Sequence, residues 1–234
     1  MAFFRSFSAA LALTLVSGLS TVAGTEAHFL TELEKGRSQK VVVYGTSLTA
    51  NAAWPAELED TLRASLSRKL RVVNAGRGGM DSRWGLANFE QRVIRERPDT
   101  VFIEFAINDA LAKSHLSVGE SMSNLEHMIS TLRGELPYCD VIVMVMNPPT
   151  GTHFHDRSRF DDYANGYRLV AKRNACRFIN FAAIWKPIIA REPERWKNYA
   201  PDGLHPNEQA CREVILPYLL KKIGFTQPPA PAGT

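Results

Sequence analysis

Five short apolar runs alternate with amphipathic stretches along this chain of 234 residues, and the alternation restricts the fold to few architectures. The runs cover residues 40–45, 70–76, 100–106, 141–149 and 177–181. The stretches with helical spacing of apolar residues cover 54–69, 83–96, 117–136, 157–174 and 207–222. Strands separated by helices form a parallel sheet with right-handed crossovers, covered on both faces. The sequence therefore predicts one α/β domain with a five-stranded parallel sheet.

Composition is typical of a soluble globular protein. Apolar residues make up 45% and charged residues 22%, which excludes a disordered, collagen-like or polytopic membrane protein. The 28 Lys and Arg residues exceed the 24 Asp and Glu residues, for a net charge of +4, but they are spread along the chain without a long run. We therefore expect a solvated surface with mild attraction for anions and no nucleic-acid partner.

The two ends of the chain differ from its middle. In residues 1–27, Arg5 precedes an apolar stretch from 7 to 19 and then small residues, the layout of a secretory signal peptide. The apolar stretch is short for a membrane span, so we expect a periplasmic or secreted protein without a stable membrane anchor. The folded domain is expected at 38–224, followed by a disordered Pro- and Ala-rich tail at 225–234.

Three cysteines, Cys139, Cys176 and Cys211, are too few for a disulfide scaffold. Cys139 and Cys176 each precede an apolar run by two residues. If these runs are neighbouring parallel strands, the two thiols lie at one sheet edge and are able to pair. The alternative is three small buried thiols.

No cluster in the sequence has the spacing of a metal site. His153, His155 and Asp156 lie in a loop after Pro148-Pro149, but no other residues offer the remaining ligands. A structural zinc site needs four protein ligands. We therefore expect neither a metal nor a cofactor.

Polar and glycine-rich segments come directly after the apolar runs. Gly45-Thr46-Ser47 follows the first run, and Asn74 to Gly79 (NAGRGG) follows the second. Asn108 follows the third, and Asp202-Gly203-Leu204-His205-Pro206 comes just before the last helical stretch. Ligand sites of parallel sheets lie beyond the carboxyl ends of the strands. We therefore expect these segments to meet at one edge of the sheet.

Together these residue types suit acyl transfer. A serine hydroxyl becomes an effective nucleophile when an imidazole takes its proton, and a carboxylate then orients the imidazole. The tetrahedral intermediate needs preorganised hydrogen-bond donors at its oxyanion. Ser47, His205 and Asp202 offer the first set, and the backbone N–H groups of Ser47 and Gly79 with the Asn108 amide offer the second.

The four segments resemble, in order, the four blocks of the GDSL/SGNH hydrolases, which are serine esterases and lipases. The resemblance covers about residues 40–222 and implies a flavodoxin-like three-layer α/β/α sandwich. It implies that Ser47 is the nucleophile, His205 the base and Asp202 the orienting carboxylate. The implied oxyanion donors are Ser47, Gly79 and Asn108, with Gly78 as a rival to Gly79 because the two glycines are adjacent.

One residue departs from the family pattern: Thr46 stands where the motif usually has Asp. That Asp is not a member of the triad, so we expect catalysis to survive. The departure also leaves a non-catalytic binding module on the same fold as an alternative function.

The substrate is predicted by class. We expect a small-molecule or polysaccharide acyl ester, with short acyl groups, above all acetyl, and carbohydrate O-deacetylation as the natural use. The sequence AWPA at 53–56 and the Asn74-Ala75 pair are nearest in motif to the acyl thioesterase and lysophospholipase branch. Hydrolysis of longer acyl chains is therefore the second interpretation.

Overall fold

A computed structural model of the chain describes residues 26–225. The predicted signal peptide lies outside the described residues up to residue 25, and so does the tail from residue 226. The strands are β1 (Gln39–Gly45), β2 (Leu70–Asn74), β3 (Thr100–Glu104), β4 (Asp140–Val145) and β5 (Arg177–Asn180). They form one parallel sheet in the order β2-β1-β3-β4-β5. The predicted five-stranded parallel sheet is confirmed.

The helices before β4 are α1 (His28–Glu34), α2 (Ser47–Ala50), α3 (Trp54–Ser65), α4 (Ser82–Ala87), α5 (Phe89–Arg92), α6 (Ala106–Asp109) and α7 (Val118–Glu135). Those after it are α8 (Thr152–Asp156), α9 (Phe160–Arg173), α10 (Ala182–Arg191), α11 (Pro193–Tyr199), α12 (Glu208–Ala210) and α13 (Leu216–Ile223). Two 3₁₀ turns, Ile94–Glu96 and Ala112–Ser114, and a π-helical turn, Cys211–Ile215, complete the described elements.

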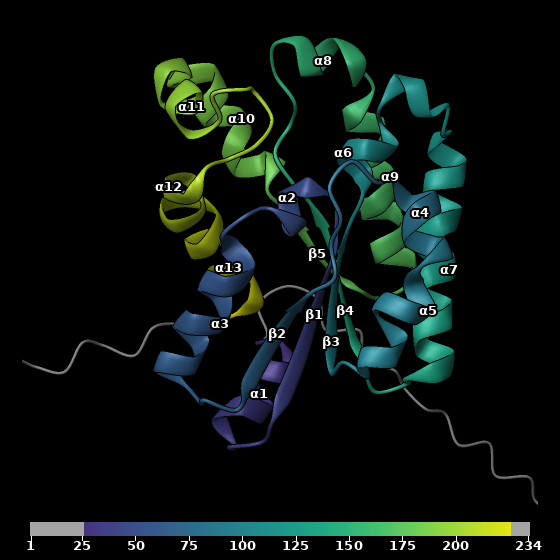
Figure 1. The fold of residues 1–234 in the computed structure, drawn as a ribbon, viewed down its shortest axis with the longest axis vertical. Helices are drawn as coiled ribbons and strands as arrows, with labels where there is room; N and C mark the ends of the chain where they lie inside the picture. The colour runs from purple at the N-terminus through teal and green to yellow at the C-terminus, as the bar shows by residue number, and fades with distance from the viewer. Residues whose placement is uncertain (1–25, 226–234) are drawn as a thin grey trace, which may run out of the picture.

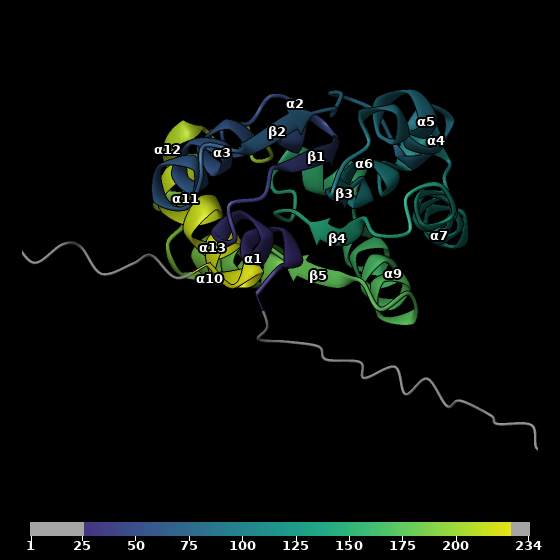
Figure 2. The same ribbon diagram turned by 90° about the horizontal axis from the view of Figure 1, so that it is seen from below.

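Helices cover both faces of the sheet, as Figures 1 and 2 show. Helices α1, α3, α10 and α13 lie on one side, and α4, α5, α7 and α9 lie on the other. This strand order is that of flavodoxin-like sheets: the chain adds β2 on one side of β1 and then adds β3, β4 and β5 on the other side. The loops after β1 and β3 therefore diverge at the carboxyl edge and leave room for a site there.

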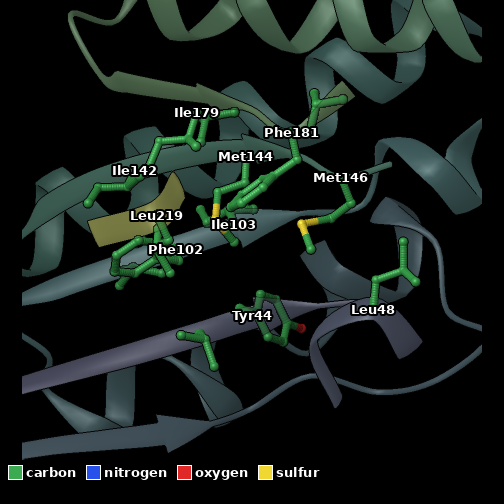
Figure 3. Close-up of a cluster of buried hydrophobic side chains, with 14 of the residues drawn as sticks. Tyr44, Leu48, Phe102, Ile103, Ile142, Met144, Met146, Ile179, Phe181 and Leu219 are labelled. Carbon is green, nitrogen blue, oxygen red and sulfur yellow. The ribbon is translucent and has the colours of Figure 1, made fainter. Parts of the chain in front are cut away.

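Central strands carry the most continuous apolar runs because they are buried on both faces. All five residues of β3 are buried, whereas the edge strands β2 and β5 are largely half-exposed. Figure 3 shows Phe102 and Ile103 of β3 among side chains from β1, β4, β5 and α13. Met146 and Leu48 extend this apolar cluster towards α2, where the functional residues begin.

Several boundaries differ from those predicted. The stretch 83–96 is not one helix but α4, α5 and a 3₁₀ turn, because Asn88 ends α4 with non-helical backbone angles. Pro148 and Pro149 end the fourth run early, so β4 stops at Val145. Helix α1 has no counterpart in the prediction, yet it packs Phe29 into the same core as β3.

The three cysteines are buried free thiols, so Cys139 and Cys176 are not paired in the structure. Burial raises the pKa of the Cys176 thiol to about 11, which keeps it protonated at neutral pH. Within residues 26–225, no helix has the length and apolar character needed to span a bilayer.

Candidate active site

Ser47 begins helix α2 immediately after β1. Thr46 caps this helix, since its hydroxyl accepts a hydrogen bond from the N–H of Leu48 at 3.2 Å. The short turn between strand and helix leaves Ser47 half-buried at the carboxyl edge. Its Oγ lies 2.9 Å from Nε2 of His205, although the two residues are 158 positions apart.

His205 and Asp202 lie on one tight turn. Nδ1 of the imidazole is 2.5 Å from Oδ2 of Asp202, and the backbone N–H groups of Leu204 and His205 donate to Oδ1 at 2.9 and 2.8 Å. Burial alone would raise the pKa of Asp202, but these hydrogen bonds from His205 and Leu204 lower it to about 2. Asp202 is therefore a carboxylate at neutral pH and holds the ring with Nε2 towards Ser47.

Residues after β4 fix this turn, and sequence reasoning missed them. The Asn147 amide donates to the Leu204 carbonyl at 2.9 Å, and the Thr150 N–H and hydroxyl both donate to the Gly203 carbonyl. Gly203 has φ +80°, and a Cβ there would lie 2.7 Å from Thr150 Oγ1, so the turn requires glycine. The nearby Pro148-Pro149 pair was the only sequence sign of a rigid segment.

The glycine loop after β2 runs beside Ser47. A Cβ on Gly78 would lie 3.6 Å from the Cβ of Ser47, and Gly79 has φ +76°, in the left-handed region that favours glycine. Asn74 ties the loop to α2, because its amide donates to the Thr49 carbonyl at 2.9 Å and accepts from the Gly76 N–H at 3.1 Å. The loop thus runs close to the nucleophile at Gly78, and the oxyanion role of the Gly79 N–H stays a prediction.

Asn108 lies on α6, directly after β3. Its side chain is buried, and Nδ2 donates to the Met80 carbonyl at 2.9 Å, which links α6 to the glycine loop. The structure therefore brings all five predicted site residues to one edge of the sheet, from four segments that are distant in sequence. The set comprises Ser47, Gly79, Asn108, Asp202 and His205.

Comparison with known proteins gives the family. The sequence model of the GDSL-like lipase/acylhydrolase family matches residues 42–212, most of the chain. The chain belongs to this family. Like its other members, it is a carboxylic ester hydrolase.

Two curated relatives are similar to this chain in sequence. An isoamyl acetate-hydrolyzing esterase 1 homolog from Mus musculus is 24% identical over 210 residues, covering 79% of this chain and 82% of the relative. A GDSL esterase/lipase from Arabidopsis thaliana is 26% identical over 194 residues, covering 71% and 78%. These identities do not assign the chain to a branch of the family.

Solved structures share the fold. An acetylxylan esterase from Geobacillus stearothermophilus, solved as a catalytic mutant, superposes with a TM-score of 0.69 at 20% identity, covering 87% of this chain and 98% of the other. A lipase/acylhydrolase from Enterococcus faecalis gives a TM-score of 0.66 at 23% identity, covering 83% and 100%. The predicted three-layer SGNH hydrolase fold is confirmed.

The buried carboxyl group of Glu104 contacts Thr46 and Thr49, on either side of the nucleophile in the sequence. Sequence reasoning did not assign it a role. Oε1 of Glu104 accepts hydrogen bonds from the Thr46 N–H at 2.7 Å, the Thr46 hydroxyl at 2.9 Å and the Thr49 hydroxyl at 2.8 Å. Burial raises the pKa of Glu104 to about 7 despite these donors. A lone Glu in the apolar run TVFIEFA was the available signal.

A second buried carboxylate, Asp109, holds α6 in place. It accepts from the Ser82 N–H at 2.7 Å, the Ser121 hydroxyl at 2.5 Å and the Tyr167 hydroxyl at 3.0 Å. These donors come from α4, α7 and α9, so one side chain connects three helices below Asn108. Burial raises the pKa of Asp109 to about 6, in spite of the three donors.

A cavity of about 270 Å³ adjoins the serine and the imidazole. Its lining is mainly apolar and comprises Ser47, Leu48, Asn51, Ala52, Met146, His205, Pro206 and Ile215. A larger cavity of about 520 Å³ is lined by the segment after β4, by α8, by the start of α9 and by α10. In the described part of the chain, no group of three or more His, Cys, Asp or Glu side chains is placed to hold a metal ion.

Proposed function

We propose that Ser47, His205 and Asp202 form a catalytic triad, and that the protein, once exported, hydrolyses short acyl esters, above all the O-acetyl groups of carbohydrates. The observation that carries the proposal is the unbroken chain of contacts from nucleophile to carboxylate. Ser47 Oγ lies 2.9 Å from His205 Nε2, and His205 Nδ1 lies 2.5 Å from Asp202 Oδ2.

In the acylation step, Ser47 Oγ attacks the ester carbonyl carbon while His205 Nε2 takes its proton. The carbonyl oxygen becomes an oxyanion, which the Ser47 and Gly79 N–H groups and the Asn108 amide stabilise. Asp202 carries the compensating negative charge for the imidazolium. Collapse of the tetrahedral intermediate breaks the bond to the alcohol oxygen, which receives the proton from His205.

In the deacylation step, a water molecule repeats the attack on the acyl-serine. His205 takes the proton of the water, the second tetrahedral intermediate uses the same donors, and the acid leaves as Ser47 regains its proton. On the protein, the charge changes fall on Ser47 and His205, which are already hydrogen-bonded to each other and to Asp202 before substrate binds. Little reorganisation is therefore needed during the reaction.

Two observations support a short acyl group. The cavity beside the triad is small, at about 270 Å³, and apolar side chains dominate its lining. The mammalian relatives are named for hydrolysis of isoamyl acetate, and a solved structure with the same fold, from Geobacillus stearothermophilus, is named for acetylxylan; both compounds are acetyl esters.

A second candidate is a thioesterase or lysophospholipase that acts on longer acyl chains. The cavity beside the triad also supports this candidate, because its apolar lining is larger than an acetyl group can cover. The apolar side chains are Leu48, Ala52, Met146 and Ile215. Chain-length preference separates the two candidates.

The test compares kcat/KM for p-nitrophenyl acetate, octanoate and palmitate. We expect the highest value for acetate, and a loss of at least about 10³-fold in Ser47→Ala. Ser130→Ala, an exposed serine on α7, is the matched control and should keep full activity. A maximum at octanoate or palmitate would favour the second candidate, and full activity in Ser47→Ala would overturn the mechanism.

A further inference from the structure

Arg157 is buried beside the candidate oxyanion hole without a carboxylate partner. Only 7% of the residue is exposed, and among residues 26–225 no Asp or Glu oxygen lies within 4 Å of its guanidinium, although the preceding residue, Asp156, attracts it at longer range. An arginine keeps its positive charge under ordinary conditions, and buried charges are normally paired. An unpaired buried cation at this position calls for an explanation.

The guanidinium contacts the residues that form the wall of the site. Nε donates to the Ile107 carbonyl at 3.0 Å, and one terminal nitrogen lies 3.4 Å from Oδ1 of Asn108. The other terminal nitrogen lies 3.4 Å from Nδ1 of His153, whose ring is edge-on to His205 at 6.4 Å between centroids. Each contact lies at or near the carboxyl edge of β3 and β4.

These contacts determine how the Asn108 amide is oriented. A guanidinium has five N–H donors and no acceptor, so only the oxygen of the amide is favourable on the Arg157 side. Nδ2 is then directed away from Arg157, where one of its two N–H groups donates to the Met80 carbonyl at 2.9 Å. The second N–H is the one required for an oxyanion donor.

The positive charge also changes the strength of this donor. A cation at the amide oxygen draws electron density from the amide nitrogen, and hydrogen bonds in such a chain strengthen one another. The interior of the protein screens this effect weakly. The Met80 carbonyl favours the same orientation from the Nδ2 side, so a neutral side chain of the same length would remove the polarisation and one of the two contacts that orient the amide.

We propose that Arg157 is a positioning residue for the oxyanion hole, acting through Asn108 rather than on the substrate. This inference rests on the proposed function, because it assigns the Asn108 amide to the oxyanion. The alternative is that Arg157 only fastens the segment after α8 to the Ile107 carbonyl of α6. That structural role affects stability without a specific effect on kcat.

A double-mutant cycle separates the two roles. The variants are Arg157→Met, Asn108→Ala and both together, with kcat and KM for p-nitrophenyl acetate and the melting temperature measured for each. We expect Asn108→Ala to lower kcat by roughly 10² to 10³-fold, as for loss of one oxyanion donor. Arg157→Met should lower kcat about tenfold or more, with KM changed less than about threefold.

The decisive comparison is the effect of Arg157→Met in the Asn108→Ala background. If Arg157 acts through the amide, the double variant is within about threefold of Asn108→Ala. If Arg157→Met lowers kcat by the same factor in both backgrounds, or lowers only the melting temperature, the proposal is overturned. Arg159→Met, which removes an exposed arginine two residues away, should leave kcat unchanged.

Two further variants test whether the effect on kcat comes from misfolding or from His153. If Arg157→Met does not fold, Arg157→Lys in both backgrounds gives the same test, because a lysine cannot donate to the Ile107 carbonyl and Asn108 in the geometry of the planar guanidinium. In a His153→Ala background, Arg157→Met should still lower kcat, whereas loss of the effect there would assign it to His153 and overturn the proposal. Ser47→Ala, measured alongside, tests the proposed function independently of every Arg157 result.

Discussion

Glu104→Gln removes a buried ionisable group close to the nucleophile while keeping the shape of the side chain and one accepting oxygen. Three donors from Thr46 and Thr49 lie within 2.7–2.9 Å of Oε1, which an amide oxygen can replace. The Thr46 hydroxyl also lies 3.2 Å from Oε2 and can accept a hydrogen bond from an amide nitrogen there. Glu104 is fully buried, and burial raises its pKa to about 7. We therefore expect the substitution to leave the fold intact and to change the pH dependence of the free energy of unfolding.

The size of the effect follows from proton binding. A glutamic acid in the unfolded chain has a pKa of 4.5, whereas the pKa of Glu104 in the folded protein is about 7. Between these two pH values the folded protein holds a proton on Glu104 that the unfolded chain has already released. Stability of the natural protein therefore falls as pH rises through this window, by about 3 kcal/mol at 1.36 kcal/mol per pH unit. Gln binds no proton in either state, so Glu104→Gln loses none of this stability, and Asp109 is common to both proteins.

The assay is urea unfolding of both proteins followed by circular dichroism at intervals from pH 4 to pH 8. We expect the free energy of unfolding of Glu104→Gln, relative to the natural protein, to rise by about 3 kcal/mol between pH 4.5 and pH 7 or just above. Asp60→Asn, the same change at an exposed carboxylate of α3, should show no such rise. A constant difference, or one that falls with pH, would mean that the Thr46 and Thr49 donors keep Glu104 ionised and would refute the reasoning.

Two more outcomes follow from the packing. Gly45→Ala places a Cβ 2.3 Å from Oε1 of Glu104, so we expect a loss of about 1–3 kcal/mol or more in thermal unfolding, whereas Gly134→Ala, an open position on α7, should be neutral or stabilising. An unchanged melting temperature in Gly45→Ala would contradict the close contact. Burial raises the pKa of Cys139 to about 12 and of Cys176 to about 11, so a thiol reagent should label both far more slowly in the folded than in the urea-unfolded protein. Equal labelling rates would show that these thiols are accessible.

The parts of the fold that sequence predicts best are those determined by local pattern. Strands β1, β3 and β4 are continuous apolar runs because both of their faces are buried, and each was located to within a few residues. The segments after the strands were also predictable, because a parallel sheet brings every strand end to one edge. That rule placed Ser47 near Asn108, whereas the turn with Asp202 and His205 follows α11 and was assigned to the site by its resemblance to the family motif.

Short helices, and helices whose sequence has no clear apolar spacing, were harder to predict. Helix α1 is only seven residues long and comes directly after the predicted signal peptide. Its apolar residues are therefore too few to show a helical spacing distinct from the apolar stretch before them. Helix α10 was not among the predicted helical stretches; it contains Pro187, which cannot donate a backbone hydrogen bond, and Trp185 packs in the core. These elements are stabilised by tertiary packing rather than by local propensity.

Supporting residues of the site could not be assigned roles from sequence, because their function depends on distant partners. Glu104 meets Thr46 across 58 positions, Arg157 meets Asn108 across 49, and Asn147 meets Leu204 across 57. An isolated charge in an apolar run signals that such a partner exists, but the identity of the partner depends on the fold.

The departure at Thr46 has a physical explanation in the same contacts. The Thr46 hydroxyl donates to Glu104 and accepts from the Leu48 N–H, so one group both caps α2 and satisfies the buried acid. An aspartate there would accept from the same N–H but place a second carboxylate next to Glu104, and two carboxylates in contact cannot both ionise without a large cost. In this chain the threonine hydroxyl caps α2, as an aspartate carboxylate at the same position would. Since Ser47 keeps its position at the start of α2, the substitution gives no structural reason to expect loss of the nucleophile.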